Sequence, residues 1–185
     1  PPRPRLSVMP ISFLTAALAQ TTAETPAPTG AAGHGAMILT FAVAILLLLV
    51  GSAFFSASET ALTAASRAKL RNRADRGDTG AETALELTRD SDRLIGAILL
   101  GNNVMNILSA SLATALFTAL WGSSGVAVAT MVMTVLVLIF AEVMPKSYAI
   151  ANPESLAARV ARPMKVVMRI LSPIVLVVRG IVRAL

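Results

Sequence analysis

The sequence predicts an all-α membrane protein with three transmembrane helices, followed by an amphipathic juxtamembrane helix on the cytoplasmic side. Hydrophobic residues make up 55% of the 185 residues and the mean hydropathy is +0.72, whereas soluble domains are roughly 45–50% apolar. The apolar residues form long blocks with most charges between them, as in polytopic membrane proteins. Inside these blocks, polar residues recur at helical spacing.

Composition narrows the possible functions. The sequence contains no cysteine, which excludes disulfides, thiolate metal sites and cysteine nucleophiles. A net charge of +6 is compatible with nucleic-acid binding, but the basic residues flank the apolar blocks, which is typical of cytoplasmic loops. We therefore expect contact with the lipid bilayer and none with nucleic acid.

Residues 1–35 are predicted to be a signal-like, flexible segment that lies outside the membrane domain of residues 36–185. Arg3 and Arg5 precede a short apolar run, and Ala17, Leu18 and Ala19 fit the small-x-small pattern of a cleavage site. Residues 21–35 are rich in Thr, Pro, Ala and Gly, a composition typical of flexible segments. The N-terminus is therefore expected outside the cytoplasm.

The first span is predicted from about residue 36 to residue 65, with a polar stripe along one face formed by Ser52, Ser56, Glu59 and Thr63. Serine and threonine hydroxyls in membrane helices commonly bond to carbonyls of their own helix. We expect this of Ser52 and Thr63. Glu59 lies near the cytoplasmic end, where it can reach water.

Residues 66–93 form the most basic loop and are therefore expected in the cytoplasm. A turn at residues 77–80 is followed by a short helix, with Thr79 and Glu82 spaced as in a capping box. A solvated connector is favoured over a binding site for this segment.

The second span, from about residue 94 to residue 121, carries the amides Asn102 and Asn106 and the hydroxyl of Ser109 on one face, and Asn103 on another. One Asn in a span usually joins helices together. Three within five residues favour a functional polar cluster, because unpartnered polar groups in lipid are costly.

The third span, from about residue 126 to residue 144, has one ionisable residue, Glu142. Pro145 removes a helix hydrogen bond and displaces the carbonyl of Ala141, and broken helices with free carbonyls commonly form cation sites. We expect helix breaks at Gly101 and Pro145, beside the ion site. Lys146 is interpreted as an interfacial anchor.

A cationic amphipathic helix is predicted over about residues 153–171, capped by Asn152 and suited to the inner membrane interface. Its two faces comprise basic residues (Arg159, Arg162, Lys165 and Arg169) and apolar residues (Val160, Met164, Val167, Met168 and Leu171). Pro163 and Pro173 are expected to kink it. The C-terminus is then cytoplasmic.

The polar residues of the spans offer only oxygen ligands, which suit Mg²⁺, Ca²⁺, Mn²⁺ or Na⁺. The predicted topology brings Ser56, Asn102 and Glu142 to a similar depth. A site with one carboxylate binds weakly, which suits transport because the ion must leave. An intramembrane serine hydrolase would need a base, but the only histidine, His34, precedes the spans, so no enzyme is predicted.

The sequence resembles the CorC/CNNM family of magnesium transporters over roughly residues 37–180, the transmembrane module also called DUF21. Three motifs carry the resemblance: FFSASETAL at 54–62, LLGNNVMNI at 99–107 and AEVMPKSYA at 141–149. The resemblance implies that Mg²⁺ is held by a span-1 serine, the first and last Asn of the second motif, and the Glu of the third. Here these are Ser56, Asn102, Asn106 and Glu142. Ser58 lies two residues from Ser56 and is the alternative for the span-1 serine.

The resemblance implies Na⁺-coupled Mg²⁺ export by a homodimer in a bacterial-type inner (plasma) membrane. Glu59 and Ser109 are the candidates for the Na⁺ site. Members of the family continue into cytoplasmic CBS domains that bind ATP. These are absent from the 185 residues, so the chain is expected to be the membrane module, with ATP acting only through those domains. The alternative is a membrane-anchored Mg²⁺ sensor or scaffold that binds the ion without moving it.

Overall fold

The structure, a computed structural model, describes residues 31–184, with side-chain surroundings for residues 34–171 and 174. It has two units, Pro1–Met37 and Ile38–Leu185. The described part of the first unit is the start of helix α2, and the contacts below belong to the second unit. The signal-like segment predicted for residues 1–35 lies, up to residue 30, outside the described residues.

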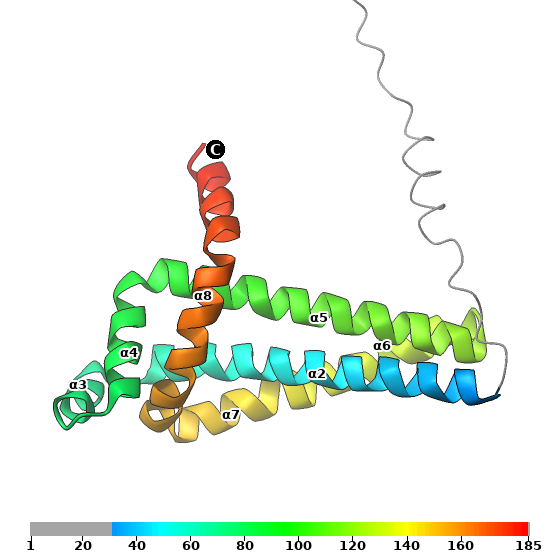
Figure 1. The fold of residues 1–185 in the computed structure, drawn as a ribbon, viewed down its shortest axis with the longest axis horizontal. Coiled ribbons are helices and arrows are strands. Elements are labelled where there is room, and N and C mark those ends of the chain that lie inside the picture. The colour runs from blue at the N-terminus through cyan, green and yellow to red at the C-terminus, as the bar shows by residue number, and fades with distance from the viewer. Residues whose placement is uncertain (1–30, 185) are drawn as a thin grey trace, which may run out of the picture. The chain divides into compact units, whose positions relative to one another are not determined.

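Among the described residues, three stretches of helix are long and apolar enough to cross a membrane, as the sequence predicts. The first is α2 (Ala31–Ala64) and the second is α5 (Ser91–Trp121). The third comprises α6 (Ser124–Leu136), a segment η2 (Val137–Val143) and α7 (Met144–Ala151). Figure 1 shows α5 running back alongside α2, and α6 reversing direction again after a tight turn.

The third span does not end at Pro145. It forms a π-helix over η2, just before the proline, and continues through the proline as α7. Pro145 has no N–H and its ring crowds the preceding turn. The wider turn of a π-helix gives room for that ring, and the N–H of Met144 bonds to the carbonyl of Ile139. The break that the sequence predicts therefore takes the form of a π-segment, a feature frequent at functional sites. Glu142 lies on it.

Gly101 is a point of close packing, and α5 continues through it without the predicted break. A Cβ atom at residue 101 would lie 2.3 Å from the ring Cζ of Phe55 on α2. The glycine therefore allows the buried Phe55 ring to sit directly against the backbone of α5.

Three further helices form what we call the helical cap: α3 (Arg67–Asp75), α4 (Thr79–Leu87) and α8 (Pro153–Ala184). The 3₁₀ turn η1 (Thr88–Asp90) joins α4 to α5. α4 packs closely on α8, since a Cβ at Gly80 would lie 2.4 Å from the carbonyl oxygen of Ala158. The buried residues of α4 are Gly80, Ala81, Ala84 and Leu87. The expectation of a solvated connector is therefore wrong for α4, because its small residues permit tight packing.

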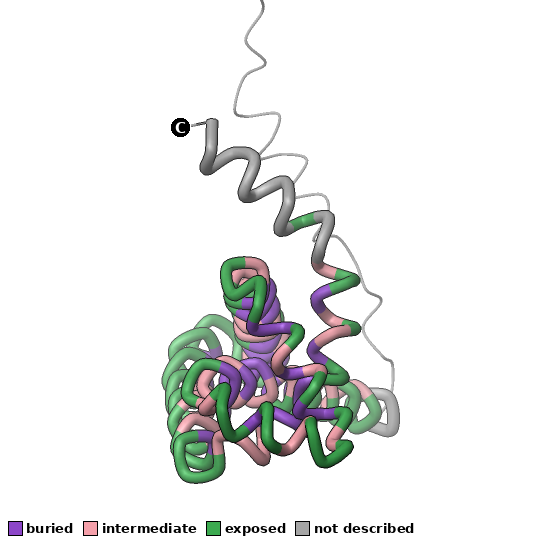
Figure 2. The backbone as a smooth tube through the Cα atoms, turned by 90° about the vertical axis from the view of Figure 1, so that its left-hand side faces the viewer, coloured by how far each residue is buried: buried purple, intermediate pink, exposed green. Residues whose placement is uncertain are grey.

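α8 is one helix that Pro163 and Pro173 do not interrupt, and it extends beyond the predicted end at residue 171. The buried residues on its predicted apolar face are Val160, Met164 and Met168, which belong to a cluster with α4 and α5. Buried and exposed positions alternate along it (Figure 2). On the basic face, Arg162 donates to the hydroxyl of Thr79, and Lys165 donates to Glu86 at 2.6 Å. The buried residues of the described part of α8 thus pack on the protein itself.

Two separate apolar clusters hold the second unit together. One joins the helical cap to α2 and α5, and includes Phe55 and Ile98. The other joins α2, α5 and the third span, and includes Leu49 and Ala113. Along α2, Ser52 falls between Leu49 and Phe55, and the amides of α5 fall between Ile98 and Ala113. The polar residues therefore lie at the boundary between two apolar cores.

Asp78 caps α4, in place of the capping box predicted from Thr79. Its Oδ1 accepts hydrogen bonds from the N–H groups of Gly80 and Ala81, both at 3.0 Å. Arg73 donates to its Oδ2 at 2.7 Å. The backbone N–H of Ala81 and the Arg73 guanidinium lower the pKa of Asp78. The carboxylate form is therefore favoured in the folded protein.

We expect Asp78→Ala to lower the free energy of unfolding by about 1 kcal/mol, the usual contribution of a helix N-cap. Because the folded-state pKa is lowered, this stabilisation is present above the ordinary carboxyl pKa and is lost as the pH falls through the folded-state value. Thermal unfolding in detergent at neutral pH and at about pH 3 measures both effects. Asp75→Ala, at an exposed position of α3, is the control, and equal stability of the two variants at neutral pH would contradict the prediction.

Candidate cation site

Ser52 of α2 lies between the two carboxamides on the facing side of α5. Its Oγ is 2.7 Å from Oδ1 of Asn102 and 2.7 Å from Oδ1 of Asn106. The two asparagines are one helical turn apart, so both oxygens reach the same hydroxyl. The interpretation that Ser52 bonds to its own helix is therefore wrong. The expectation of a bond within the same helix is confirmed for Thr63, whose hydroxyl donates to the carbonyl of Glu59 at 2.7 Å.

The Ser52 hydroxyl has one proton for its two carboxamide contacts. A serine hydroxyl can donate to only one acceptor at a time, so the other carboxamide is satisfied either by turning its N–H₂ group toward the Ser52 oxygen or by binding a cation through its own oxygen. Ser52 itself is fully buried, and a buried polar group without a partner costs free energy. A cation bound between these oxygens would accept their lone pairs and so satisfy them without a proton.

Ser56 lies one turn after Ser52 and is also fully buried. Its Oγ has no hydrogen-bond partner among the described residues. The neighbouring Ser58 differs, because its hydroxyl donates to the carbonyl of Phe54 at 2.7 Å. Of these two serines, Ser56 is therefore the one whose hydroxyl has no partner among the described residues.

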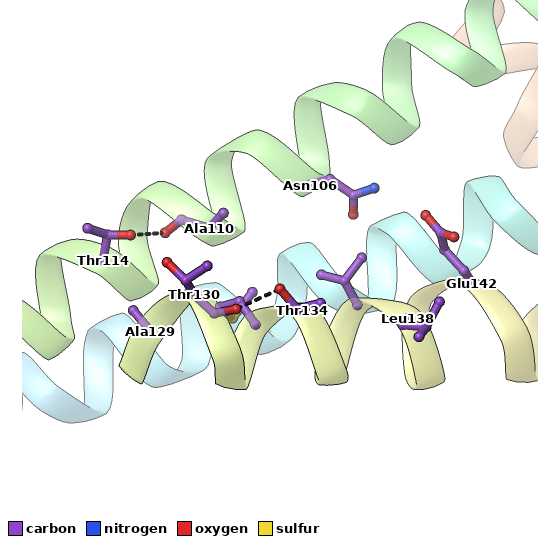
Figure 3. Close-up of a pocket in the computed structure, with 10 residues that line it drawn as sticks. Asn106, Ala110, Thr114, Ala129, Thr130, Thr134, Leu138 and Glu142 are labelled. Carbon is purple, nitrogen blue, oxygen red and sulfur yellow. Dashed lines mark hydrogen bonds between the residues drawn. The ribbon is translucent and has the colours of Figure 1, made fainter. Parts of the chain in front are cut away.

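Glu142 and Asn106 line one cavity of about 420 Å³ between α5 and the third span. Figure 3 shows the carboxylate and the carboxamide directed into the same space from opposite helices. Glu142 is partly buried, and in the described part of the chain it forms no hydrogen bond or ion pair that would neutralise it. The described residues contain no group of three or more His, Cys, Asp or Glu that could hold a metal. A cation here would therefore bind through one carboxylate and several neutral oxygens.

Three of the four predicted ligands are thus brought together, in two pairs that share Asn106, and Ser56 is not. Ser52 links Asn102 to Asn106, and Asn106 shares a cavity with Glu142. Ser56 is not among the residues that line this cavity. Asn103 is exposed, as its different helical face predicts. Ser52 is not among the ligands predicted from the sequence, although its place in the polar stripe of α2 was the available signal.

The candidate Na⁺ ligands have partners within the protein. Glu59 lies 3.6 Å from the amino group of Lys146, an ion pair between α2 and α7. Lys146 is therefore a countercharge to Glu59, and its role as an interfacial anchor stays a prediction. Ser109 is buried and donates to the carbonyl of Asn106 at 3.0 Å. Its hydroxyl fixes the turn of α5 that carries Asn106.

Comparison with known proteins gives consistent matches. Residues 42–185 match the family model described as the cyclin M transmembrane N-terminal domain, CNNM. The chain is 41% identical over 137 residues to the UPF0053 inner membrane protein YfjD of Escherichia coli, covering 72% of this chain and 31% of that protein. It is 34% identical over 136 residues to a UPF0053 protein of Haemophilus influenzae, covering 74% and 32%.

A more distant relative is named for a transported substrate. The chain is 26% identical over 150 residues to the polyamine export protein of Escherichia coli, covering 74% of this chain and 34% of that protein. The chain spans about a third of the length of these curated relatives.

Proposed function

Because the chain belongs to the cyclin M (CNNM) transmembrane domain family, we propose that it is the membrane domain of a transporter that exports Mg²⁺ in exchange for Na⁺. The observation that supports this most directly is the buried polar cluster around Ser52, whose hydroxyl lies 2.7 Å from the carboxamide oxygens of both Asn102 and Asn106. Such a cluster at membrane depth suits a hard cation.

In this proposal Asn102, Asn106 and Glu142 are ligands of the transported Mg²⁺, and Ser56 provides a hydroxyl. Ser52 holds the two carboxamides with their oxygens converging. One carboxylate and neutral oxygens give modest affinity, which lets the ion leave after each cycle. The function requires no catalytic residue, so the protein is proposed to be a transporter and not an enzyme.

The proposed mechanism is alternating access about the π-segment η2. The segment places Glu142 on the part of the third span where helical hydrogen bonding is least regular, and such segments accommodate rearrangement. The Glu59–Lys146 pair connects α2 to α7, on the side of η2 away from the α5–α6 turn. Movement of α7 relative to α2 would therefore stretch a surface ion pair, which costs little.

The proposed assembly is a homodimer in an inner membrane, with the N-terminus outside and the helical cap in the cytoplasm. The positive charges of α3 and α8 support this orientation. ATP is proposed to act only through CBS domains, which lie outside these 185 residues.

A second candidate substrate is a polyamine. The name of the Escherichia coli relative favours it, as does the cavity next to Glu142, whose lining residues continue along α5 and α6. Against it, the cavity has a single carboxylate and no aromatic side chain, whereas an elongated polycation needs several negative or π-rich contacts. A Mg²⁺ sensor that binds without transport is the third possibility.

Flux into liposomes that contain the protein separates these functions. We expect Mg²⁺ flux that depends on an opposing Na⁺ gradient and is not inhibited by spermidine. Spermidine flux without Mg²⁺ flux would identify a polyamine exporter. Mg²⁺ binding, measured calorimetrically in detergent, with no flux of either cation would identify a sensor and contradict the proposal.

A further inference from the structure

The cavity that begins at Asn106 and Glu142 continues along α5 and α6, away from the helical cap. Its further lining includes three threonines from the two facing helices, Thr114, Thr130 and Thr134. Figure 3 shows them following one another between α5 and α6, with the small Ala110 and Ala129 leaving room beside them. The cation site is therefore one end of a longer groove.

The groove covers a substantial part of the membrane thickness. At 1.5 Å per residue, Thr114 lies roughly 12 Å beyond Asn106 along α5. α5 ends at Trp121, and the turn at Gly122 leads into α6. The hydrocarbon core of a bilayer is about 30 Å thick. The groove therefore extends over a large part of the distance between the cation site and the membrane surface at this turn.

The threonine hydroxyls present oxygen acceptors along the groove. Thr114, Thr130 and Thr134 each donate their proton to a carbonyl of their own helix, at 2.7 to 2.9 Å. Their oxygens keep free lone pairs, which can bind water or a cation. Threonines of this kind are common in membrane helices. Here, however, they come from two facing helices and line the same cavity as the carboxylate of Glu142.

We propose that this groove is the water-filled passage between the cation site and the membrane side of the α5–α6 turn, and that Thr130 and Thr134 solvate the cation along it. This inference rests on the proposed function, because a transporter needs a route from its cation site to each side of the membrane, and the groove would be the second of these routes. The hydroxyl oxygens replace part of the hydration shell, as carbonyl and hydroxyl groups do in other ion pathways.

Cysteine labelling tests the passage directly, since the chain has no cysteine of its own. Thr130→Cys and, on the facing helix, Ala110→Cys are reconstituted and treated with a cationic, membrane-impermeant methanethiosulfonate added on the turn side. Thiol reagents of this class need the hydrated thiolate. We expect both variants to react at least about tenfold faster than their controls, a difference of ~1.4 kcal/mol.

The matched controls are Met131→Cys and Val135→Cys, which occupy exposed positions on α6 outside the groove. Reaction of the groove cysteines no faster than the controls would overturn the passage. Reaction only from the opposite membrane side would overturn its direction. Labelling does not require transport, so unreactive groove cysteines in a protein that carries Mg²⁺ would overturn the passage alone, whereas a native protein without flux would overturn the proposed function.

A transport measurement tests the role of the hydroxyls. Thr130→Val keeps the shape of the side chain and removes its oxygen, so we expect Mg²⁺ flux to fall about tenfold, the effect of one lost polar contact, with unchanged Mg²⁺ affinity at the site. Thr118→Val, at an exposed position of α5 outside the groove, is the control. Equal flux in both variants would overturn the role of Thr130.

Discussion

Glu142→Gln is expected to lower the affinity for Mg²⁺ at least tenfold and to abolish measurable flux. Glu142 supplies the single carboxylate of the cavity, and glutamine preserves its size while removing its charge. At an effective dielectric constant of about 20, a contact between unit charges at 4 Å contributes about 4 kcal/mol, and tenfold in affinity corresponds to only ~1.4 kcal/mol. Isothermal titration in detergent measures the affinity.

Glu82→Gln is the control for this substitution. Glu82 is exposed on α4 and does not line the cavity, so its loss should leave Mg²⁺ binding unchanged. If Glu142→Gln bound Mg²⁺ as well as the Glu82 variant does, the carboxylate could not be a ligand. The cation would then have to be held by the oxygens around Ser52 alone.

Gly125→Ala is expected to destabilise the fold by about 1–3 kcal/mol, the usual cost of overpacking, or more. A Cβ at residue 125 would lie 2.1 Å from the carbonyl oxygen of Phe117 and 2.4 Å from its carbonyl carbon. These are backbone atoms of α5, which cannot rotate away as the ring of a side chain can. The two spans would have to separate beside the Gly122 turn.

The single tryptophan reports this change, because Trp121 ends α5 and its ring lies tilted against that of Phe117, with ring centroids 5.3 Å apart. Thermal unfolding in detergent, followed by Trp fluorescence, measures the loss of stability. Gly35→Ala is the matched control, since its Cβ would have no atom within 4 Å. Equal midpoints for the two variants would show that α5 and α6 do not approach each other as closely as described.

The spans and the main polar residues could be predicted from the sequence because membrane helices have strong signals. Long apolar blocks set the number of spans, and the spacing of Asn102 and Asn106 placed both on one face and Asn103 on another. The family motifs identified the domain. These features depend on local pattern, which hydropathy and helical periodicity report directly.

Features that depend on contacts between helices could not be predicted. Ser52 differs from Thr63 only because α5 brings two carboxamides to it. Gly101 suggested a break, yet it accommodates the ring of Phe55 from another helix. α4 looked solvated because the closely packed surface of α8 is distant in sequence. The π-segment before Pro145 is one of several ways to accommodate a proline, and sequence alone does not choose among them.

The most direct test of the account is Mg²⁺ flux in liposomes with a Na⁺ gradient, compared between Asn106→Ala and Asn103→Ala. The two residues have the same side chain and lie three positions apart on α5. Only Asn106 contacts Ser52 and lines the cavity. We predict that Asn106→Ala abolishes flux and that Asn103→Ala retains it. Flux that survives in Asn106→Ala would contradict the assignment of the cation site.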